Sequence, residues 1–409
     1  MNLDIQIRPP ERFIYKLIII NNMVVQQMMF KYRIYPSEKQ KVRLINSFKI
    51  CKEVYNTLLD LNKKLLITNK YGLDSLIIDL KCCNPTIKNV HSQVLQNVSD
   101  RLSKAFDNFF RRIKENSKEK GYPRFKSRIN SITYPQSGFK FINERRLYAS
   151  KIGSIPIVLH RTPKGKIKTM AIKVNKAGQW FACFSCEIPE VKVKHPSKEK
   201  IGIDMGIESF ATLSNGEFIE NPKYLIKAER KLKRVQRRFS RKKLRSNNRR
   251  KYRFKLAKQH LKVFNQRTDF LHKVSYGIAK SNSFIAVEDL QIKNMVKNHH
   301  LAKSINDVSW GNFLNMLSYK AVKSGGKFVK VNPRNTSKTC SNCGTIIDMP
   351  LSNRIFKCPS CDFVCHRDLN ASLNVLGQGL SESTPVGDTV RPSFLKAGVV
   401  ESGTICEIV

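Results

Sequence analysis

The sequence predicts a mixed α/β protein built from several domains, and three observations support this prediction. Apolar residues recur at helical spacing over residues 38–120. Short apolar segments separated by Gly, Pro and Asn follow over 121–197, as in a small antiparallel β domain. From residue 198 onward strand patterns alternate with helical ones, and five of the 11 cysteines crowd into residues 340–365.

Charge restricts the partners of this chain. Lys and Arg number 75 against 31 Asp and Glu, so the 409 residues carry a net charge of +44. Such a surplus destabilises a compact chain by self-repulsion unless a polyanion offsets it. Nucleic acid is therefore the favoured partner, and an anionic membrane surface is the second choice.

The sequence does not predict membrane insertion or secretion. The longest apolar runs, such as residues 17–20, fall far short of the roughly 20 residues that a bilayer requires. Residues 1–27 lack the ordered regions of a signal peptide. Clustered cysteines favour a metal site in a reducing compartment over a secreted disulfide scaffold. We expect a cytoplasmic protein without a membrane partner, associated with the nucleoid of a prokaryotic host.

Both ends of the chain look different from the part between them. Residues 1–28 show no clear period and are expected to be an N-terminal extension. Residues 379–409 are rich in Ser, Thr, Pro and Gly, which predicts a flexible tail.

The first ordered part begins with a strand and continues as helices. Residues 30–35 alternate as a strand does. Ser37 and Gln40 have the spacing of a capping box, which places a helix N-terminus at Ser37. Residues 38–120 are therefore expected to form a small helical domain.

The next part is expected to form a small β domain. It combines residues 29–37 with residues 121–197, where apolar segments and turn residues alternate. Cys183 and Cys186 form a Cys-x-x-Cys pair within a predicted strand. Because a separation of three places two strand side chains on opposite faces, we interpret them as packing residues.

An α/β core is expected over residues 198–336 together with 366–378. Apolar runs predict its strands at 201–204, 284–287 and 327–331. Acidic residues stand at the ends of two of these strands, which makes this core the candidate site of chemistry.

A strongly basic helical pair is predicted within this core, at residues 222–281. Residues 223–262 contain 19 Lys or Arg and a single acid, Glu229. A run of charge is often only a solvated face, but nearly unopposed charge on a helix is costly without a counter-polyanion. We therefore favour contact with nucleic acid over a charged face that is merely exposed to solvent. Four residues represent this surface: Lys231, Arg234, Arg237 and Arg238.

The most specific local pattern is a pair of Cys-x-x-Cys knuckles separated by 14 residues: Cys340, Cys343, Cys358 and Cys361. Two knuckles complete a tetrahedral Zn²⁺ site, and four protein ligands make that zinc structural, because a catalytic zinc keeps one position open. Residues 337–365 are thus expected to form a zinc ribbon. Cys365 and His366 could substitute as ligands, although a complete thiolate set needs neither.

A second, dispersed constellation consists of acids. Asp204 ends one predicted strand, Glu288 ends another, and Asp368 opens the helix that follows the cysteines. Ionised carboxylates in apolar surroundings are costly unless they are paired or bind metal, and two metal ions can promote phosphodiester hydrolysis. Spacing alone leaves competing acids open: Glu208, Asp289, Asp307 and Asp362.

Six short motifs indicate which family the chain resembles and which of these acids are functional. In chain order they are 32–40 (Tyr-Arg-Ile-Tyr-Pro-Ser-Glu-Lys-Gln), 122–126 (Tyr-Pro-Arg-Phe-Lys), 202–206 (Gly-Ile-Asp-Met-Gly), 287–290 (Val-Glu-Asp-Leu), 336–344 (Thr-Ser-Lys-Thr-Cys-Ser-Asn-Cys-Gly) and 366–371 (His-Arg-Asp-Leu-Asn-Ala). Over about residues 29–377 the chain resembles the transposon-encoded TnpB (OrfB) family. Family members are compact RNA-guided DNA endonucleases related to type V CRISPR effectors.

The resemblance implies a fold and a set of functional residues. The fold is an RNase H-like (RuvC) nuclease core with an inserted helical hairpin and a zinc ribbon, plus a helical recognition domain and a wedge-like β domain. Asp204, Glu288 and Asp368 would be the RuvC acidic triad that holds two Mg²⁺ ions, for which Mn²⁺ can substitute. The cysteine pairs would hold zinc, and the basic hairpin would contact RNA or heteroduplex.

The function that follows is an RNA-guided, Mg²⁺-dependent DNA endonuclease encoded by a mobile element. Its partners would be a guide RNA from the transposon end and double-stranded DNA with a short flanking motif. Two alternatives remain: a non-cleaving DNA-binding accessory or regulator of transposition, and an autonomous transposase. An intact acidic triad favours the nuclease, because a binding protein has no need of three metal-ligating acids.

Overall fold

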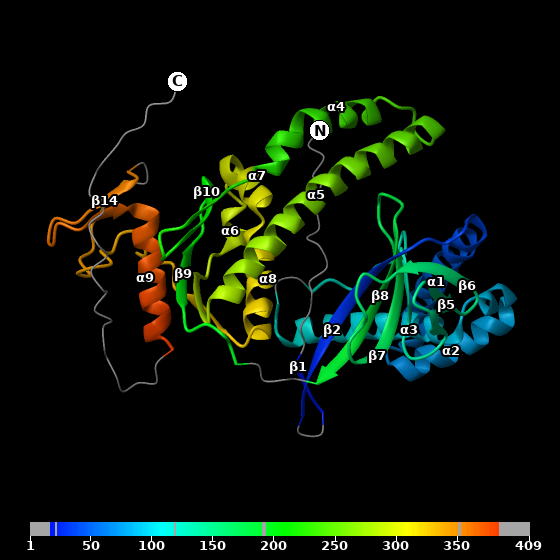
Figure 1. The fold of residues 1–409 in the computed structure, drawn as a ribbon. Helices are drawn as coiled ribbons and strands as arrows, with labels where there is room; N and C mark the ends of the chain where they lie inside the picture. Colours follow the sequence, from blue (N-terminus) through cyan, green and yellow to red (C-terminus); the bar gives the residue numbers. More distant parts are fainter. Residues whose placement is uncertain (1–16, 21–22, 118–119, 190–193, 351–352, 384–409) are drawn as a thin grey trace. The chain divides into compact units, whose positions relative to one another are not determined.

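A computed structural model of the chain describes residues 17–20, 23–117, 120–189, 194–350 and 353–383. The chain divides into two compact units, Met1–Val191 and Lys192–Val409, which are described separately (Figure 1). Most of the expected N-terminal extension and nearly all of the expected tail lie outside the described residues. None of the helices in the described ranges is long and apolar enough to cross a membrane.

An eight-stranded antiparallel sheet underlies the first unit. Its strands are β1 (Leu17–Ile20), β2 (Met23–Ile34), β3 (Ser131–Tyr134), β4 (Phe139–Asn143), β5 (Arg146–Ala149), β6 (Gly153–Val158), β7 (Lys166–Val174) and β8 (Trp180–Pro189). Their order is β3-β7-β8-β2-β6-β5-β4, with β1 paired to β2. The antiparallel strands predicted for 121–197 are confirmed. Cys183 and Cys186 are both buried within β8, as expected of packing residues.

Helices follow β2 in the first unit: α1 (Glu38–Leu65), α2 (Lys70–Cys83), the short 3-10 helix η1 (Pro85–Asn89) and α3 (Ser92–Lys114). The predicted capping box is confirmed. The Ser37 hydroxyl accepts a hydrogen bond from the backbone N–H of Gln40, and the Gln40 side chain accepts one from the backbone N–H of Ser37. The helices and the sheet share one continuous hydrophobic core, although the sequence suggested two separate domains.

Part of the expected N-terminal extension, residues 1–28, has regular secondary structure. β2 begins at Met23, seven residues before the predicted strand, and residues 17–20 pair with it as β1. Because β2 lies inside the sheet, its ladder of backbone hydrogen bonds comes from strands on both sides. The pairing partners, rather than a local pattern in residues 23–29, make this part of the chain a strand.

A five-stranded sheet forms the centre of the second unit. Its strands are β9 (Lys200–Asp204), β10 (Ser209–Leu213), β11 (Phe218–Glu220), β12 (Phe284–Glu288) and β13 (Lys327–Val331), in the order β11-β10-β9-β12-β13. β9, β12 and β13 run parallel, whereas β10 and β11 are antiparallel to their neighbours. All three strands predicted for the core are therefore present. Parallel neighbours bring the carboxyl ends of β9 and β12 to one edge of the sheet.

The helices of the second unit are α4 (Tyr224–Ser240), α5 (Asn247–Ser281), α6 (Ile292–Met295), α7 (His299–Val308), α8 (Trp310–Lys323) and α9 (Arg367–Ser381). α4 and α5 are the predicted basic pair (Figure 1). The Ser246 side chain caps the start of α5. A two-stranded sheet, β14 (Ile355–Lys357) with β15 (Val364–His366), precedes α9. α9 continues to Ser381, so the first residues of the expected tail are helical.

Candidate active site and metal centre

The parallel pairing of β9 and β12 places two of the predicted acids side by side. Ile203 and Val287 are partners in the register of these strands, and Asp204 and Glu288 follow them directly. Parallel partners project their side chains to the same face of the sheet. The two carboxylates therefore share one edge of the sheet.

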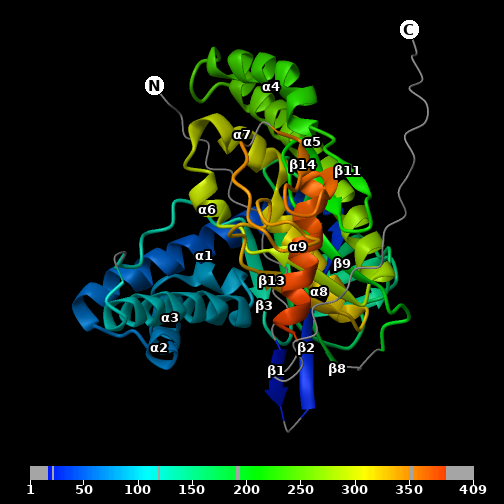
Figure 2. The same ribbon diagram turned by 90° about the vertical axis from the view of Figure 1, so that its left-hand side faces the viewer.

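The third acid reaches this edge because α9 packs closely against the sheet, beside β9 in one view and in front of it in the other (Figure 1 and Figure 2). A Cβ atom added to Gly202 of β9 would lie 2.1 Å from the carbonyl oxygen of Ser372 in α9. A Cβ atom added to Gly379 of α9 would lie 2.6 Å from the Cβ of Ala286 in β12. Each element thus supplies one glycine at a point where a side chain would push helix and sheet apart.

Asp368 lies in the first turn of α9, about one turn before Ser372. Its charge acts on Asp204, which places it near that acid. The negative charges of Glu288 and Asp368 both act on Asp204 and raise the pKa of its carboxyl group. The structure therefore brings together the three acids that the sequence analysis selected.

Burial and mutual repulsion make this cluster unfavourable as three bare anions. Desolvation is the largest cause that raises the pKa of Asp204, followed by the charges of Glu288 and Asp368, and the pKa reaches about 8. Burial also raises the pKa of Glu288, opposed by a 2.6 Å hydrogen bond that the Thr336 hydroxyl donates to its Oε1 atom. Cations at this edge would offset the repulsion, and carboxylate oxygens are the ligands that Mg²⁺ prefers.

Two arginines accompany the acids, and neither was predicted from the sequence. The Nη2 atom of Arg367 lies 3.4 Å from Oδ1 of Asp368, and Nη1 of Arg354 lies 3.8 Å from its Oδ2. Arg354 also forms an ion pair with Glu208. Arg367 stands within the motif at 366–371, so the motif was a usable signal, whereas nothing local marks Arg354.

The competing acids have other partners. Asp289 is half-exposed and pairs with Lys330, with Nζ 2.8 Å from Oδ1. Asp362 lies in the turn of the second cysteine knuckle, where its φ is +54°. Glu208 is the exposed partner of Arg354. Each has an ordinary structural explanation.

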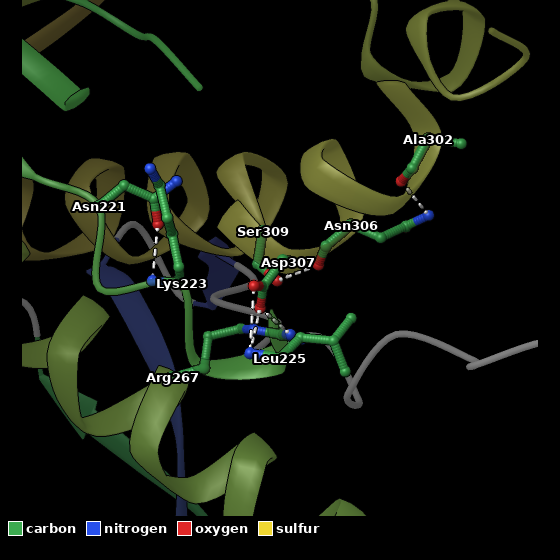
Figure 3. A network of polar contacts seen from close by, with 8 residues as sticks. All are labelled: Asn221, Lys223, Leu225, Arg267, Ala302, Asn306, Asp307 and Ser309. Carbon is green, nitrogen blue, oxygen red and sulfur yellow. Dashed lines mark hydrogen bonds and ion pairs between the residues drawn. The ribbon is translucent and has the colours of Figure 1, made fainter. Parts of the chain in front are cut away.

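Asp307 is buried and connects three helices of the second unit (Figure 3). Its carboxylate accepts hydrogen bonds from the backbone N–H of Leu225 in the first turn of α4, at 3.1 and 3.2 Å. It also pairs with Arg267 of α5, at 2.6 Å. Asp307 therefore anchors the base of the basic helical pair to α7, and it is not one of the clustered acids.

The four predicted cysteines meet at one point. The Sγ atoms of Cys340, Cys343, Cys358 and Cys361 all lie within 4.8 Å of one another. Two of the separations are 3.7 Å, from Cys340 to Cys361, and 3.5 Å, from Cys343 to Cys358. A tetrahedral ion with Zn–S bonds of about 2.3 Å requires sulfur atoms about 3.8 Å apart. The cluster fits a structural zinc ion.

The two alternative ligands are used elsewhere. His366 is the N-cap of α9, and its Nδ1 atom accepts a hydrogen bond from the backbone N–H of Asp368. Cys365 is half-buried in β15 opposite Phe356 and is not part of the cysteine group. His366 therefore supports the acidic cluster rather than the metal centre.

Hydrogen bonds join the first cysteine knuckle to the acids. The side chains of Asn370 and Asn374 in α9 donate to the Thr339 carbonyl oxygen, at 2.7 and 2.6 Å. The backbone N–H of Ser341 donates to the Asn370 side chain at 2.9 Å. These contacts tie the first cysteine knuckle to α9, which carries Asp368. The hydrogen bond from Thr336 to Glu288 adds a second connection between this part of the chain and the acids.

The four basic residues selected on α4 are exposed: Lys231, Arg234, Arg237 and Arg238. Lys231, Arg234 and Arg238 recur at intervals of three and four, so they share one face of the helix. The opposite face carries Leu232, which is buried where α4 packs along α5. The four basic side chains therefore face solvent and do not take part in the packing of α4 against α5.

These features define a mixed α/β protein with N-terminal helices and a four-cysteine cluster near the C-terminus. Three family models match the chain: "Probable transposase" (OrfB, IS605 type) at residues 183–299, "Cas12f1-like, TNB domain" at 310–375 and a "Helix-turn-helix domain" of OrfB at 23–70. The last match begins at the first residue of β2.

Relatives and one solved structure extend the similarity to most of the chain. A "Putative RNA-guided DNA endonuclease" of Streptomyces pristinaespiralis is 34% identical over 379 residues, covering 89% of this chain and 92% of the relative. The "Putative RNA-guided DNA endonuclease InsQ" of Escherichia coli K12 is 31% identical, covering 86% and 92%. The fold resembles that in "Cryo-EM structure of the Cas12f1-sgRNA-target DNA complex", with a TM-score of 0.52, 17% identity and 82% of both chains covered. The chain belongs to the transposon-encoded TnpB (OrfB, IS605) family.

Proposed function

We propose that this protein is an RNA-guided DNA endonuclease whose active site is the cluster of Asp204, Glu288 and Asp368. The observation that carries the proposal is the convergence of the three acids at the carboxyl edge of β9 and β12. The names of the relatives support it, because two of them, each covered over 92% of its length, are called RNA-guided DNA endonucleases. The five-stranded sheet with α9 against it supports a RuvC-like nuclease core.

The acids would hold Mg²⁺ through their carboxylate oxygens. Bound divalent cations would supply an activated water and positive charge for the leaving oxygen of a phosphodiester. Thr336 fixes one oxygen of Glu288 by its 2.6 Å hydrogen bond, which leaves the other oxygen for a cation. His366 caps the turn that presents Asp368, and Arg367 limits repulsion within the cluster.

Base pairing with a guide RNA would choose the DNA, while the protein holds the nucleic acid through its backbone and shape. The exposed charges of α4 and the excess charge of +44 support this role. In the proposal, the four-cysteine ribbon is structural and fixes the position of Asp368. The guide would come from the transposon end, and the target would carry a short flanking motif.

Plasmid cleavage by protein co-purified with its RNA tests the proposal. Asp204→Asn should reduce cleavage on the order of a thousandfold or more, because loss of metal ligation removes several kcal/mol of transition-state stabilisation. Glu288→Gln and Asp368→Asn should behave alike, and a triple variant should be no worse than a single one, because the acids act as a unit. Binding of RNA and target should remain.

Asp289→Asn is the matched control, because this acid follows Glu288 directly but is half-exposed and paired with Lys330. It should cleave nearly as well as the unchanged protein. Cleavage should require Mg²⁺ or Mn²⁺, with Ca²⁺ supporting binding only. Normal cleavage by Asp204→Asn would refute the proposed site. Target binding without cleavage by the unchanged protein would favour a regulator, and strand transfer would favour a transposase.

The basic surface on α4 has a separate test. Replacing Lys231, Arg234, Arg237 and Arg238 together by Gln should weaken RNA binding and flatten the slope of log affinity against log salt, because fewer counterions are released. Fluorescence anisotropy over a salt series measures this slope. An unchanged slope would show that this face does not contact the RNA.

A further inference from the structure

One motif of the sequence has no role in the proposed active site. Residues 121–126, Gly-Tyr-Pro-Arg-Phe-Lys, follow α3 in the first unit and have no regular secondary structure. The segment is nevertheless fixed in place. Asn56 of α1 donates to the Lys126 carbonyl oxygen at 3.1 Å and accepts from its N–H at 2.8 Å. A backbone pinned in this way by one side chain is held in a defined position.

The other end of the segment is fixed as well. The Tyr122 hydroxyl donates to Oδ1 of Asn62 at 3.0 Å, and Arg112 donates to the Gly121 carbonyl oxygen at 3.0 Å. The Tyr122 ring packs edge-on against Phe106 and Phe109 of α3, with centroids 5.7 and 5.2 Å apart. Tyr122 thus anchors the segment between the C-terminal parts of α1 and α3.

Phe125 does not serve this anchoring. Its side chain is 52% exposed, although the backbone on both sides of it is held. Its ring has the Lys63 ammonium 4.9 Å from the centroid, and Lys63 also pairs with Asp60 at 3.0 Å. An exposed aromatic ring on a fixed backbone loses little conformational entropy when another flat ring stacks on it.

The charge around Phe125 indicates what would stack there. Arg124 and Lys126 flank the ring and are exposed. Residues 120–143 contain five Lys or Arg and no Asp or Glu. Aromatic rings interleaved with basic side chains are typical of surfaces that bind unpaired nucleic acid, where bases stack and cations contact phosphates. This excess of positive charge in residues 120–143 argues against a purely apolar partner.

We propose that Tyr122–Lys126 forms a stacking platform for an unpaired nucleotide, with Phe125 receiving the base and Arg124 and Lys126 contacting the flanking phosphates. The inference rests on the proposed function for its choice of nucleic acid as ligand. It adds a contact in the first unit that neither the acidic cluster nor the basic helical pair provides.

Tryptophan fluorescence tests the platform directly. The two natural tryptophans, Trp180 and Trp310, are only 6% and 2% exposed. Phe125→Trp therefore introduces an exposed indole whose emission reports stacking. Titration with a single-stranded 15-nucleotide oligothymidine should quench this emission. Phe110→Trp is the matched control, because Phe110 is 50% exposed on α3 but lies outside the fixed segment; its emission should change little.

Affinity supplies the second measurement. Phe125→Leu keeps the apolar bulk but removes the ring, so single strands should bind on the order of tenfold more weakly. The affinity for a strand with abasic sites, and the melting temperature, should not change. Equal loss for normal and abasic strands, no loss at all, or a change only in self-association would overturn the proposal. None of these readouts depends on cleavage, so the platform and the proposed nuclease can fail separately.

Discussion

The four-cysteine cluster and the acidic cluster are both connected to α9, but the sequence specifies them differently. The cysteines are close together in the chain, whereas the acids are far apart in it. All four cysteines fall within residues 340–361, and each knuckle brings two thiols together by local backbone turns. The acids are spread from Asp204 to Asp368. They meet because two strands pair in one register and one helix lies flat against them. Local spacing defines a structural metal site, whereas a dispersed acidic site depends on the packing of the whole unit.

The two clusters are also connected. Asn370 and Asn374 of α9 donate hydrogen bonds to Thr339, one residue before the first cysteine, and Thr336 donates to Glu288. The cysteine cluster therefore holds the strand end and the helix start that carry two of the acids. Disruption of the cysteine cluster should therefore also displace the acids and reduce cleavage.

The largest effect is expected from removing a cysteine of the cluster. Cys340→Ser should abolish binding of about one zinc per chain, because a structural zinc site needs all four ligands. Cleavage should also fall strongly, since the knuckle no longer supports Thr339 and the start of α9. Metal analysis and plasmid cleavage measure the two losses.

Cys365→Ser is the control, because Cys365 lies in the same ribbon outside the cysteine group. This variant should retain its zinc. A Cys340→Ser protein that holds zinc and cleaves normally would show that the two clusters are independent.

A smaller effect is expected from lifting α9 off the sheet. Gly202→Ala introduces a Cβ atom 2.1 Å from the Ser372 carbonyl oxygen, so helix or strand must shift. Overpacking of this kind costs about 1–3 kcal/mol of unfolding free energy. Cleavage should fall as well, because Asp368 moves relative to Asp204, while zinc binding should persist. Chemical denaturation and metal analysis separate these outcomes.

Gly377→Ala provides the comparison on the same helix. An added Cβ there meets no atom within 4 Å, and alanine is the better helix former by about 1 kcal/mol. The variant should be as stable as the unchanged protein or more so. Equal damage from both substitutions would contradict the close approach at Gly202 as the cause.

The smallest effect concerns pH. The pKa of Asp204 is raised to about 8 in the folded protein without Mg²⁺, above the ordinary value of 3.8. The folded state therefore binds this proton more tightly than the unfolded state does. The stability that results is complete below about pH 4 and is lost as the pH rises to about 8. Denaturation of zinc-containing protein without Mg²⁺ should show the unfolding free energy falling across this window.

Two comparisons sharpen the assignment. Asp204→Asn should reduce this pH dependence, because the substituted group no longer titrates. Added Mg²⁺ should stabilise the unchanged protein more at pH 8 than at pH 5, because the ion must displace a proton from the cluster. A pH profile that Asp204→Asn leaves unchanged would assign the titration to another group.

Features governed by short-range hydrogen bonds could be predicted from the sequence. Ser37 caps α1 and pairs with Gln40 as the spacing predicts. The hairpin between β10 and β11 turns at Asn215 and Gly216, where Gly216 has a φ of +90°. These signals involve residues a few positions apart, so no distant packing can alter them greatly.

Other features could not be predicted because they depend on distant partners. β1 and the first part of β2 are strands only by virtue of their neighbours in the sheet. The four-residue helix α6 is too short for a helical period to be recognised, whereas α7 has one, at Leu301, Ile305 and Val308, that the sequence-based prediction did not use. The sequence could not separate Asp307 from the catalytic candidates, because its partners, Arg267 and the backbone N–H of Leu225, are far from it in the chain.

The sequence by itself determined the charge of the chain, its helix caps and turns, the four cysteine ligands and, through its motifs, the identity of the three acids. These properties follow from residue types and short spacings. Only the tertiary structure decided that the acids share one edge, since this requires the register of β9 and β12 and the glycines that seat α9. It alone showed that Phe125 is exposed on a fixed backbone. Bringing together residues far apart in the chain costs conformational entropy, and only the packing of the whole fold offsets that cost. No local sequence pattern therefore predicts such contacts.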